Sequence, residues 1–352
     1  MPVGEFVERA NRAGRGNREM VEVMRVGVIG QGELGAVHAG NLSLVPGVRL
    51  AAVASDARAR PGAVAAVRSA GATVVDTDSI CDKALVDAVV IATPTDTHAE
   101  YVERAIRAGL PVFCEKPLAR TLAEAERIRN LAAQRNAKVA VGHVVRYFPE
   151  YAGAHALVQD GKLGTPVTAR LSRHNCSPAA MGGWYADSKR SGGVVFDMAI
   201  HDVDWCLWSF GPAVRVYAVR SGASGQEVAS ITIRHRTGTI SYIDSSWRSA
   251  SFSTSLEVCG TDGLYHVEGS TSAGLRLSTA GLDQASYLPR VADVGGQDDP
   301  YVMELRAACD WFSGGSPPLA TVADACEAIR VVEAAEQSIL GGVPVTLGAV
   351  PA

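Results

Sequence analysis

The stretch VGVIGQGELGAVHAGNL, residues 26–42, constrains the fold of this chain more than any other segment. Gly30, Gly32 and Gly35 form a GxGxxG pattern between an apolar, strand-like run and a helix. Such glycines permit a tight turn, let the backbone approach a pyrophosphate and let the helix pack closely, while the helix amino end favours negative charge. Because the pattern opens the first strand–helix unit, a dinucleotide site is favoured over a tight turn without a ligand. The cofactor-binding residues expected here are Gly30, Gln31, Gly32, Glu33, Leu34 and Gly35.

Short apolar runs alternate with helix-period segments from residue 24 to about residue 142, as in βα units on a parallel sheet. Thr121 and Glu124 form a capping box that begins a helix over residues 121–135. This segment therefore predicts an α/β fold with a parallel, doubly wound Rossmann sheet. Its expected strands are residues 25–29, 49–54, 73–75, 87–92, 111–114 and 138–141.

The pattern changes after about residue 150. Residues 228–234 and 239–247 alternate in hydropathy around a Thr237-Gly238 turn, as the strands of an antiparallel hairpin do. Two helices are expected at about residues 300–313 and 321–340, and Gly341-Gly342 ends the second. The predicted organisation is an arm at residues 1–23, a dinucleotide-binding domain at 24–145 and an α+β substrate domain at 146–352, whose final helices can pack back on the first domain.

Composition narrows the class of protein. A chain of 352 residues with 47% hydrophobic residues can bury the cores of two domains. Its net charge of -4 offers no basic excess, so nucleic acid is not expected as a partner. The first 23 residues contain no apolar run, which argues against a signal peptide or a membrane span. Seven cysteines without a CxxC pair argue against disulfides and structural zinc, and point to a reducing cytoplasm.

The end of the second predicted strand, AAVASDARAR, bears on the choice of cofactor. An acidic residue at this place holds the ribose 2′-hydroxyl of NAD, whereas a nearby arginine accommodates the 2′-phosphate of NADP. Ser55 occupies the acidic position and Arg58 follows, which slightly favours NADP. Asp56 can still reach the ribose and the arginine can belong to a solvated helix face, so NAD and NADP both stay open.

The loop after the fourth predicted strand, VVIATPTDTHAEYVERAI, is expected to border the nicotinamide side of the cofactor. Thr93 and Pro94 follow the strand directly, and Thr97 with Glu100 can cap the next helix. Capping alone explains much of this segment. His98 is placed beside the cofactor as a helix-start residue and not as a catalyst.

The segment FCEKPLA, residues 113–119, follows the fifth predicted strand. Ligands of open α/β sheets bind beyond the carboxyl ends of the strands, so Glu115 and Lys116 are expected at the cofactor crevice. An ordinary salt bridge between Glu115 and Lys116 is the alternative. Pro117 favours a functional lysine, because an X-Pro bond can fix it in a rigid and even cis turn.

A second group of chemical residues lies in SGGVVFDMAIHDVDWCLWSFG, residues 191–211. Asp197, His201 and Asp204 stand at i, i+4 and i+7, so a regular helix would place all three on one face. A carboxylate beside an imidazole can orient it and raise its basicity, as a general base for an alcohol requires. A purely structural Asp–His pair is the alternative. A metal site is not expected, because no second histidine stands at ligand spacing.

Three motifs in this order resemble those of the glucose-fructose oxidoreductase, inositol dehydrogenase and MocA family. They are GxGxxG at residues 30–35, Glu115-Lys116-Pro117, and the element from Asp197 to His201-Asp202. The resemblance covers about residues 24–347 and includes ACEAIRVVEAAEQSILGGVPVTL at the carboxyl end, which is similar to the family's last helix and strand. It implies a Rossmann domain joined to an α+β domain with an open, mostly antiparallel sheet. It also implies a homodimer or homotetramer assembled through that sheet.

The resemblance further implies the roles of the site residues. Lys116 would hydrogen-bond the reacting hydroxyl, Asp197 would be its carboxylate partner, and His201 the acid/base. Arg146, Asn175 and Asp204 match positions that touch substrate in inositol dehydrogenases. Two departures leave the substrate open, namely Arg173 where a histidine is expected, and Tyr185 after Trp184 where many members carry arginine.

The expected reaction is reversible oxidation of a secondary alcohol on a sugar, cyclitol or aminosugar ring by NAD or NADP, as in inositol 2-dehydrogenases. His201, oriented by Asp197, would take the hydroxyl proton while Lys116 steadies the alkoxide. An amino group on the substrate would pair with Asp204. The alternatives are an NAD-dependent glycoside hydrolase of the same fold, which restores the hydride after elimination, and a non-catalytic nicotinamide redox sensor.

Overall fold

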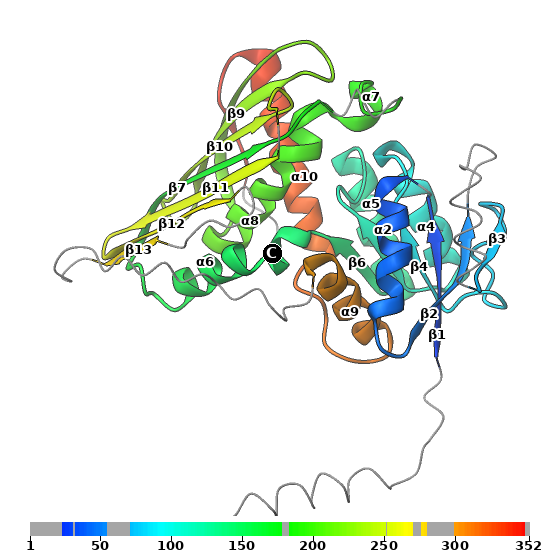
Figure 1. The fold of residues 1–352 in the computed structure, drawn as a ribbon. Coiled ribbons are helices and arrows are strands. Elements are labelled where there is room, and N and C mark those ends of the chain that lie inside the picture. Colours follow the sequence, from blue (N-terminus) through cyan, green and yellow to red (C-terminus); the bar gives the residue numbers. More distant parts are fainter. Residues whose placement is uncertain are drawn as a thin grey trace, which may run out of the picture.

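The computed structural model describes residues 23–30, 32–54, 71–177, 183–250, 252–269, 276–279 and 299–348. Two sheets lie side by side, joined by helices that pack between them (Figure 1). Ser55, Asp56, Arg58 and Gln31 lie outside the described residues, as does the predicted arm except for its last residue.

The first sheet is a six-stranded parallel sheet in the order β3-β2-β1-β4-β5-β6, which is the Rossmann order. The chain reverses its direction of winding between β1 and β4, so the crevice for a ligand opens beyond the carboxyl ends of these strands. All six strands were predicted, and none of their ends is displaced by more than one residue. They are β1 (Met24–Ile29), β2 (Val48–Ala54), β3 (Thr73–Val75), β4 (Ala88–Ile91), β5 (Val112–Glu115) and β6 (Val139–Gly142).

Helices α2 (Glu33–Asn41), α4 (His98–Ala108) and α5 (Leu122–Arg135) accompany this sheet. The capping box of α5 is confirmed, with Thr121 and Glu124 each bonding the other's backbone N–H. The predicted cap by Thr97 is wrong. Its hydroxyl lies 2.7 Å from the Pro94 carbonyl oxygen and does not accept from the first turn of α4.

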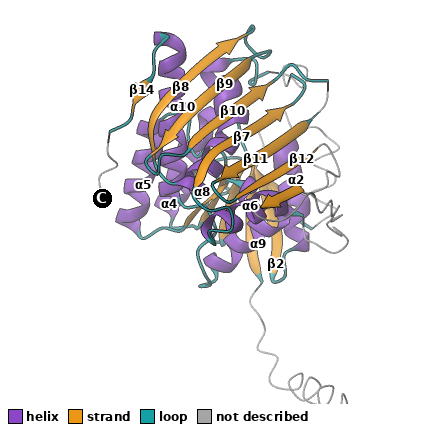
Figure 2. Cartoon of the chain, turned by 90° about the vertical axis from the view of Figure 1, so that its left-hand side faces the viewer, coloured by secondary structure: helices purple, strands orange, loops and turns teal. Residues whose placement is uncertain are grey.

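The second sheet has eight described strands in the order β13-β12-β11-β7-β10-β9-β8-β14, antiparallel except for the β7–β10 pair. The predicted hairpin is confirmed as β9 and β10, with Gly238 at φ 95° in the turn between them. Figure 2 looks onto this sheet, with the helices behind it. The strands are β7 (Pro166–His174), β8 (Ala213–Ser221), β9 (Val228–His235), β10 (Ile240–Ser246), β11 (Ser253–Gly260), β12 (Gly263–Gly269), β13 (Arg276–Thr279) and β14 (Val345–Thr346).

Helices α6 (Pro149–Gln159), α8 (Ile200–Phe210) and α10 (Val322–Gly341) lie between the sheets (Figure 1). The short helix η3 (Val144–Tyr147) contacts α6 and α8, and a second short helix is α7 (Ser188–Ser191). Helix α9 (Pro300–Phe312) packs back on the first sheet, where its Val302 and Leu305 join the core formed by Val26 and Val28. The predicted pair of final helices is confirmed as α9 and α10.

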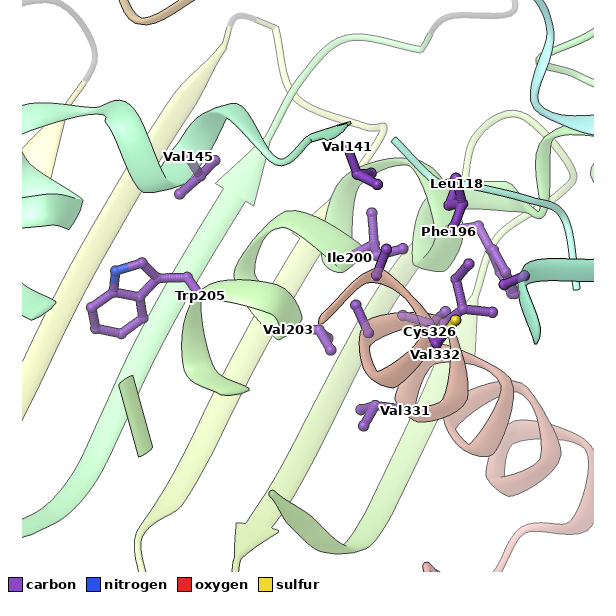
Figure 3. Packing of buried hydrophobic residues seen from close by; sticks show 14 of the residues in the cluster. Leu118, Val141, Val145, Phe196, Ile200, Val203, Trp205, Cys326, Val331 and Val332 are labelled. Atoms are coloured by element: carbon purple, nitrogen blue, oxygen red, sulfur yellow. The ribbon is translucent and has the colours of Figure 1, made fainter. Parts of the chain in front are cut away.

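One apolar core runs from the first sheet through α8 to α10 (Figure 3). Leu118 and Val141 from the first sheet's loops and strands meet Ile200 of α8 and Val332 of α10. Burial of these side chains fixes α8 against the carboxyl edge of the Rossmann sheet. Among the described residues, no helix is long and apolar enough to cross a membrane.

Candidate active site

The glycine-rich turn has the shape that a dinucleotide requires. Gly30 has φ 104°, and a Cβ there would lie 2.4 Å from the Ala92 carbonyl oxygen. A Cβ on Gly35 would lie 2.2 Å from the Gly30 carbonyl oxygen. The backbone of α2 therefore packs directly against the backbone of the turn, with no room for a side chain between them. A Cβ on Gly32 would meet nothing within 4 Å. The first and third glycines thus permit close packing, while the middle one faces the open space at the amino end of α2, where a pyrophosphate would fit.

Two loops at the carboxyl edge of the sheet are tied together by His98. This buried side chain lies 2.7 Å from the Pro117 carbonyl oxygen through Nδ1, and 2.8 Å from the Thr93 carbonyl oxygen through Nε2. Burial lowers the pKa of His98, although both carbonyl contacts oppose it. His98 therefore holds the loop of Thr93 and Pro94 against the Lys116 turn, and it does not line the cavity described below.

Lys116 reaches across to the second group of predicted residues. Its Nζ donates to Asp197 Oδ1 at 2.9 Å and to the Asp197 carbonyl oxygen at 2.8 Å. The Lys116-Pro117 peptide bond is cis. The alternative salt bridge between Glu115 and Lys116 is not formed, because the Glu115 carboxylate bonds His38 and the Lys116 backbone N–H instead.

The segment before α8 is not the regular helix that the spacing predicts. Residues Val195–Ala199 form a π-helical turn, and α8 begins only at Ile200. A π turn widens the helix by one residue and shifts the faces that follow it. Asp197 and His201 still line one cavity. Asp204, three residues further along the regular helix α8, lies buried outside the cavity, where it pairs with Arg146.

A cavity of about 150 Å³ opens where the two sheets face each other. Seven of its lining residues were predicted as site residues, and they come from five separate segments. Four were not predicted: Val144, Cys176, Trp247 and Tyr301. Trp247 and Cys176 follow the ends of the parallel neighbours β10 and β7, but sequence alone gives no sign of that pairing. The lining residues are Leu34, Glu115, Lys116, Val144, Asn175, Cys176, Tyr185, Asp197, His201, Trp247 and Tyr301.

His201 is a neutral imidazole within this cavity. Burial, followed by the positive charges of Lys116 and Arg173, lowers its pKa well below the ordinary value. Its Nδ1 has no hydrogen-bond partner in the described part of the chain. The predicted orientation of His201 by Asp197 is not seen, because the Asp197 carboxylate is engaged by Lys116. A neutral imidazole with free acceptor capacity can still take a proton from an alcohol.

Two predicted substrate-binding arginines are instead buried in ion pairs. Arg146 forms two hydrogen bonds with the Asp204 carboxylate, at 2.8 and 2.7 Å. Arg173 forms two with Asp202, at 3.1 and 2.8 Å. Neither pair lines the cavity; the first anchors α8 to the short helix η3, and the second anchors α8 to β7.

Among the remaining predicted residues, Asn175 and Tyr185 line the cavity and Trp184 does not. Trp184 stacks on Tyr185 with their ring centroids 4.0 Å apart. Burial raises the pKa of Tyr185, and the negative charge of Asp197 adds to this effect. Trp184 thus supports a phenol that stays protonated at neutral pH and can donate a hydrogen bond.

Comparisons with known proteins agree with this geometry. Residues 24–143 match the family described as "Oxidoreductase family, NAD-binding Rossmann fold", and residues 151–266 match the "GFO/IDH/MocA C-terminal domain". The chain is 30% identical to an inositol 2-dehydrogenase of Rhizobium meliloti, over 88% of this chain and 97% of that protein. It is 27% identical to a myo-inositol 2-dehydrogenase of Thermotoga maritima, over 90% and 96% of the two chains.

A solved structure gives the same fold with a cofactor bound. The crystal structure of GenD2 from gentamicin A biosynthesis, in complex with NAD, superposes with a TM-score of 0.79 at 28% identity. The match covers 95% of this chain and 99% of GenD2. These matches agree with the glycine turn and with the cavity that holds the Lys116–Asp197 pair and His201. The chain belongs to the Gfo/Idh/MocA oxidoreductase family.

Proposed function

We propose that this protein is a nicotinamide-dependent dehydrogenase that oxidises a secondary alcohol on a cyclitol or sugar ring, or reduces the corresponding ketone. The observation that carries the proposal is the convergence of Lys116, Asp197 and His201 on one cavity beside the glycine turn. The inositol dehydrogenases among its relatives support the class of substrate.

The turn at Gly30, Gly32 and Gly35 would hold the pyrophosphate of the cofactor, and Thr93 and Glu115 would border its nicotinamide end. When bound, the nicotinamide supplies the acceptor or donor of the hydride. The remaining chemistry belongs to the chain.

His201 would accept the hydroxyl proton, since its lowered pKa keeps it neutral near pH 7. The Lys116 ammonium would donate a hydrogen bond to the same oxygen and stabilise its developing negative charge. Asp197 orients Lys116 through the 2.9 Å ion pair. In this arrangement the Asp197 carboxylate binds and orients Lys116, and it does not orient His201.

The cavity favours a neutral polyhydroxylated ring. Among its described lining residues, Lys116 is the one lysine or arginine, and the Asp197 carboxylate pairs with it. The second lining carboxylate, Glu115, is bonded by His38 behind the Lys116 turn. Asn175, Tyr185 and Tyr301 add an amide and two hydroxyls, which suit ring hydroxyl groups. Pairing of Asp204 with a substrate amino group is not favoured, because Arg146 already occupies that carboxylate.

The choice between NAD and NADP rests on residues outside the described structure. Ser55 with Arg58 slightly favours NADP, whereas Asp56 can hold the ribose of NAD. GenD2, the solved relative described above, contains NAD. Both cofactors therefore belong in the first assay.

We further propose that the protein forms a homodimer or homotetramer through the second sheet. The exposed face of this sheet carries large apolar side chains, including Tyr217, Val219 and Tyr242, each at least 39% exposed. Exposed apolar groups gathered on one face favour association. Sedimentation velocity of the wild-type chain, with Val219→Lys as a disruptive variant, would measure the assembly; a monomeric wild type would contradict it.

The direct test of the activity is the rise in reduced-nicotinamide absorbance when the protein meets inositols, hexoses, uronates and aminosugars with NAD or NADP. Turnover with a neutral ring alcohol is expected, and it should be lost in Lys116→Ala and His201→Ala while cofactor binding persists. Retained cofactor without net release of NADH would indicate the glycoside hydrolase. Cofactor binding with no turnover on any substrate or ketone would indicate the redox sensor.

A further inference from the structure

The segment that carries Asp197 begins with a turn of two glycines. Gly192 and Gly193 have φ 79° and 68°, so both lie in the left-handed region that favours glycine. The turn leads into the π-helical residues Val195–Ala199, which include Asp197. A π-helical turn is rare and occurs frequently at functional sites. The position of Asp197, and with it the ion pair to Lys116, therefore depends on the contacts that hold this turn.

A buried carboxyl group from the second sheet makes one of these contacts. Glu227, one residue before β9, is 4% exposed, and its Oε2 accepts the backbone N–H of Val194 at 3.0 Å. The first N–H groups of a helix have no partner within the helix, so a side-chain oxygen that accepts from one of them stabilises the helix end. The neighbouring N–H of Gly193 donates to Ser191 Oγ at 3.1 Å. Glu227 thus supplies, from a different element, an acceptor that the segment needs at its amino end.

The glycine turn and the Glu227 side chain fit each other closely. A Cβ on Gly193 would lie 2.9 Å from Glu227 Oε2 and 3.1 Å from Oε1. A side chain at Gly193 would therefore push the carboxyl group away from Val194. The absence of a side chain at this position is what lets the carboxyl group reach the backbone.

The backbone of Glu227 contacts a second part of the cavity wall. Its carbonyl oxygen accepts the backbone N–H of Trp247 at 2.9 Å. Trp247 lines the same cavity as Asp197 and His201. Glu227 therefore joins two segments of the cavity wall, one through its side chain and one through its backbone.

We propose that Glu227 is a positioning residue for the dehydrogenase reaction, because its hydrogen bond to Val194 holds the π turn in which Asp197 binds Lys116. The Val194 N–H is buried, and without this acceptor it would be left unpaired, which costs free energy. The turn would then relax toward a backbone conformation that pairs the N–H, and Asp197 would move with it. Glu227 acts on the reacting groups only through Asp197, and this kinetic role rests on the proposed function.

Three substitutions separate the reach of the side chain from its charge. Glu227→Gln keeps an acceptor oxygen at the same reach. Glu227→Asp keeps a carboxyl group but withdraws it by one methylene, and Glu227→Met removes the acceptor at similar volume. Turnover should fall by about tenfold or more in the Asp and Met variants, because a displacement of about 1 Å can cost 10²-fold, and it should stay close to the wild-type value in the Gln variant.

Cofactor affinity should be the same in all three variants, because the glycine turn that would hold the pyrophosphate belongs to the other sheet. Glu268→Met, on β12, is the matched control, since the Glu268 side chain is 77% exposed. Steady-state kinetics and cofactor titration would measure the two quantities separately.

A second readout does not depend on activity. Hydrogen exchange of the backbone amides of residues 194–199, followed by mass spectrometry, should be faster in the Asp and Met variants and match the wild type in the Gln variant. Exchange in β4 should stay the same in all of them. This measurement tests the hydrogen bond even if no ring alcohol is oxidised, so failure of the proposed activity is distinguishable. If the Met variant does not fold, the Asp variant carries the same test.

Four results would overturn the proposal. Wild-type turnover and exchange in the Asp and Met variants would show that the bond does not hold the turn. Faster exchange with undiminished turnover would show that the held turn does not matter for the reaction. A Gln variant as impaired as the Met variant would assign the effect to the charge or packing of Glu227. A loss of cofactor affinity that parallels the loss of turnover would assign it to a general loss of structure.

Discussion

The Asp197 carboxylate lies 2.9 Å from Nζ of Lys116, and no hydrogen bond joins it to His201. Lys116 and Asp197 stand 81 positions apart in the chain. Lys116 lies in the loop after β5, and Asp197 lies in the π turn before α8. The Lys116 ammonium is thereby held in place as a hydrogen-bond donor, and the lowered pKa of His201 leaves that imidazole neutral. This division of roles within one cavity is what the oxidation of an alcohol requires.

Replacing Lys116 with alanine should lower turnover by about 10²- to 10³-fold, because a donor aimed at a developing alkoxide is removed. Cofactor affinity should change little. Steady-state kinetics and titration of the protein fluorescence with cofactor would separate the two effects. Lys162→Ala, on an exposed residue, provides the matched control. Unchanged turnover in Lys116→Ala would remove the lysine from the mechanism.

The pH dependence of kcat/KM for alcohol oxidation should report His201. Its folded pKa is depressed, so the imidazole is a neutral base at pH 7 and becomes protonated only well below its ordinary value of 6.5. Activity is therefore expected to hold on the acid side of neutrality and to fall only at a pH well under 6.5. His201→Asn should lose about 10²- to 10⁴-fold in rate, while His266→Asn outside the cavity should not. An acid limb at or above 6.5 would exclude His201 as the base.

The buried Arg146–Asp204 pair should act on stability. Removing Arg146 leaves the Asp204 carboxylate buried without a cation, so Arg146→Met should lower the free energy of unfolding by about 3–5 kcal/mol. Asp204→Leu should lower it by less, because Asp324 remains 3.5 Å from the Arg146 guanidinium. The double variant should be less destabilised than the sum of the two. Urea unfolding of the four proteins would measure this coupling. A raised KM with unchanged stability in Arg146→Met would instead mean that Arg146 touches substrate.

Two glycines of the GxGxxG turn should respond differently to alanine. A Cβ on Gly35 would lie 2.2 Å from a backbone oxygen, so Gly35→Ala should lower the melting temperature markedly. Gly32 has φ -69°, and a Cβ there meets no atom within 4 Å, so Gly32→Ala should fold normally. Its methyl group would enter the space assigned to the pyrophosphate and weaken cofactor binding. Calorimetric melting and cofactor titration of both variants test this; equal cofactor affinity of Gly32→Ala and wild type would move the pyrophosphate elsewhere.

Much of the fold was accessible from local patterns. The six strands of the first sheet, the hairpin of β9 and β10, and the capping box of Thr121 depend on residues close together in the chain. Side-chain alternation and caps act within a few residues, so a single sequence displays them. The position of Lys116 beyond a parallel strand followed from the same patterns.

The contacts that the predicted site residues make were decided only by tertiary structure. The spacing predicted Asp197, His201 and Asp204 on one helical face. In the structure Asp197 and His201 share a cavity, with Asp197 bonded to Lys116, whereas Asp204 is buried outside it and bonded to Arg146. Tyr301 lines the cavity because α9 folds back on the first sheet, although it stands more than 180 residues after Glu115 in the chain. Local patterns determine which helices and strands form and where a strand ends. Which charged side chains meet depends on how the two sheets and the helices between them pack, and the residues that determine this packing are spread over the whole chain.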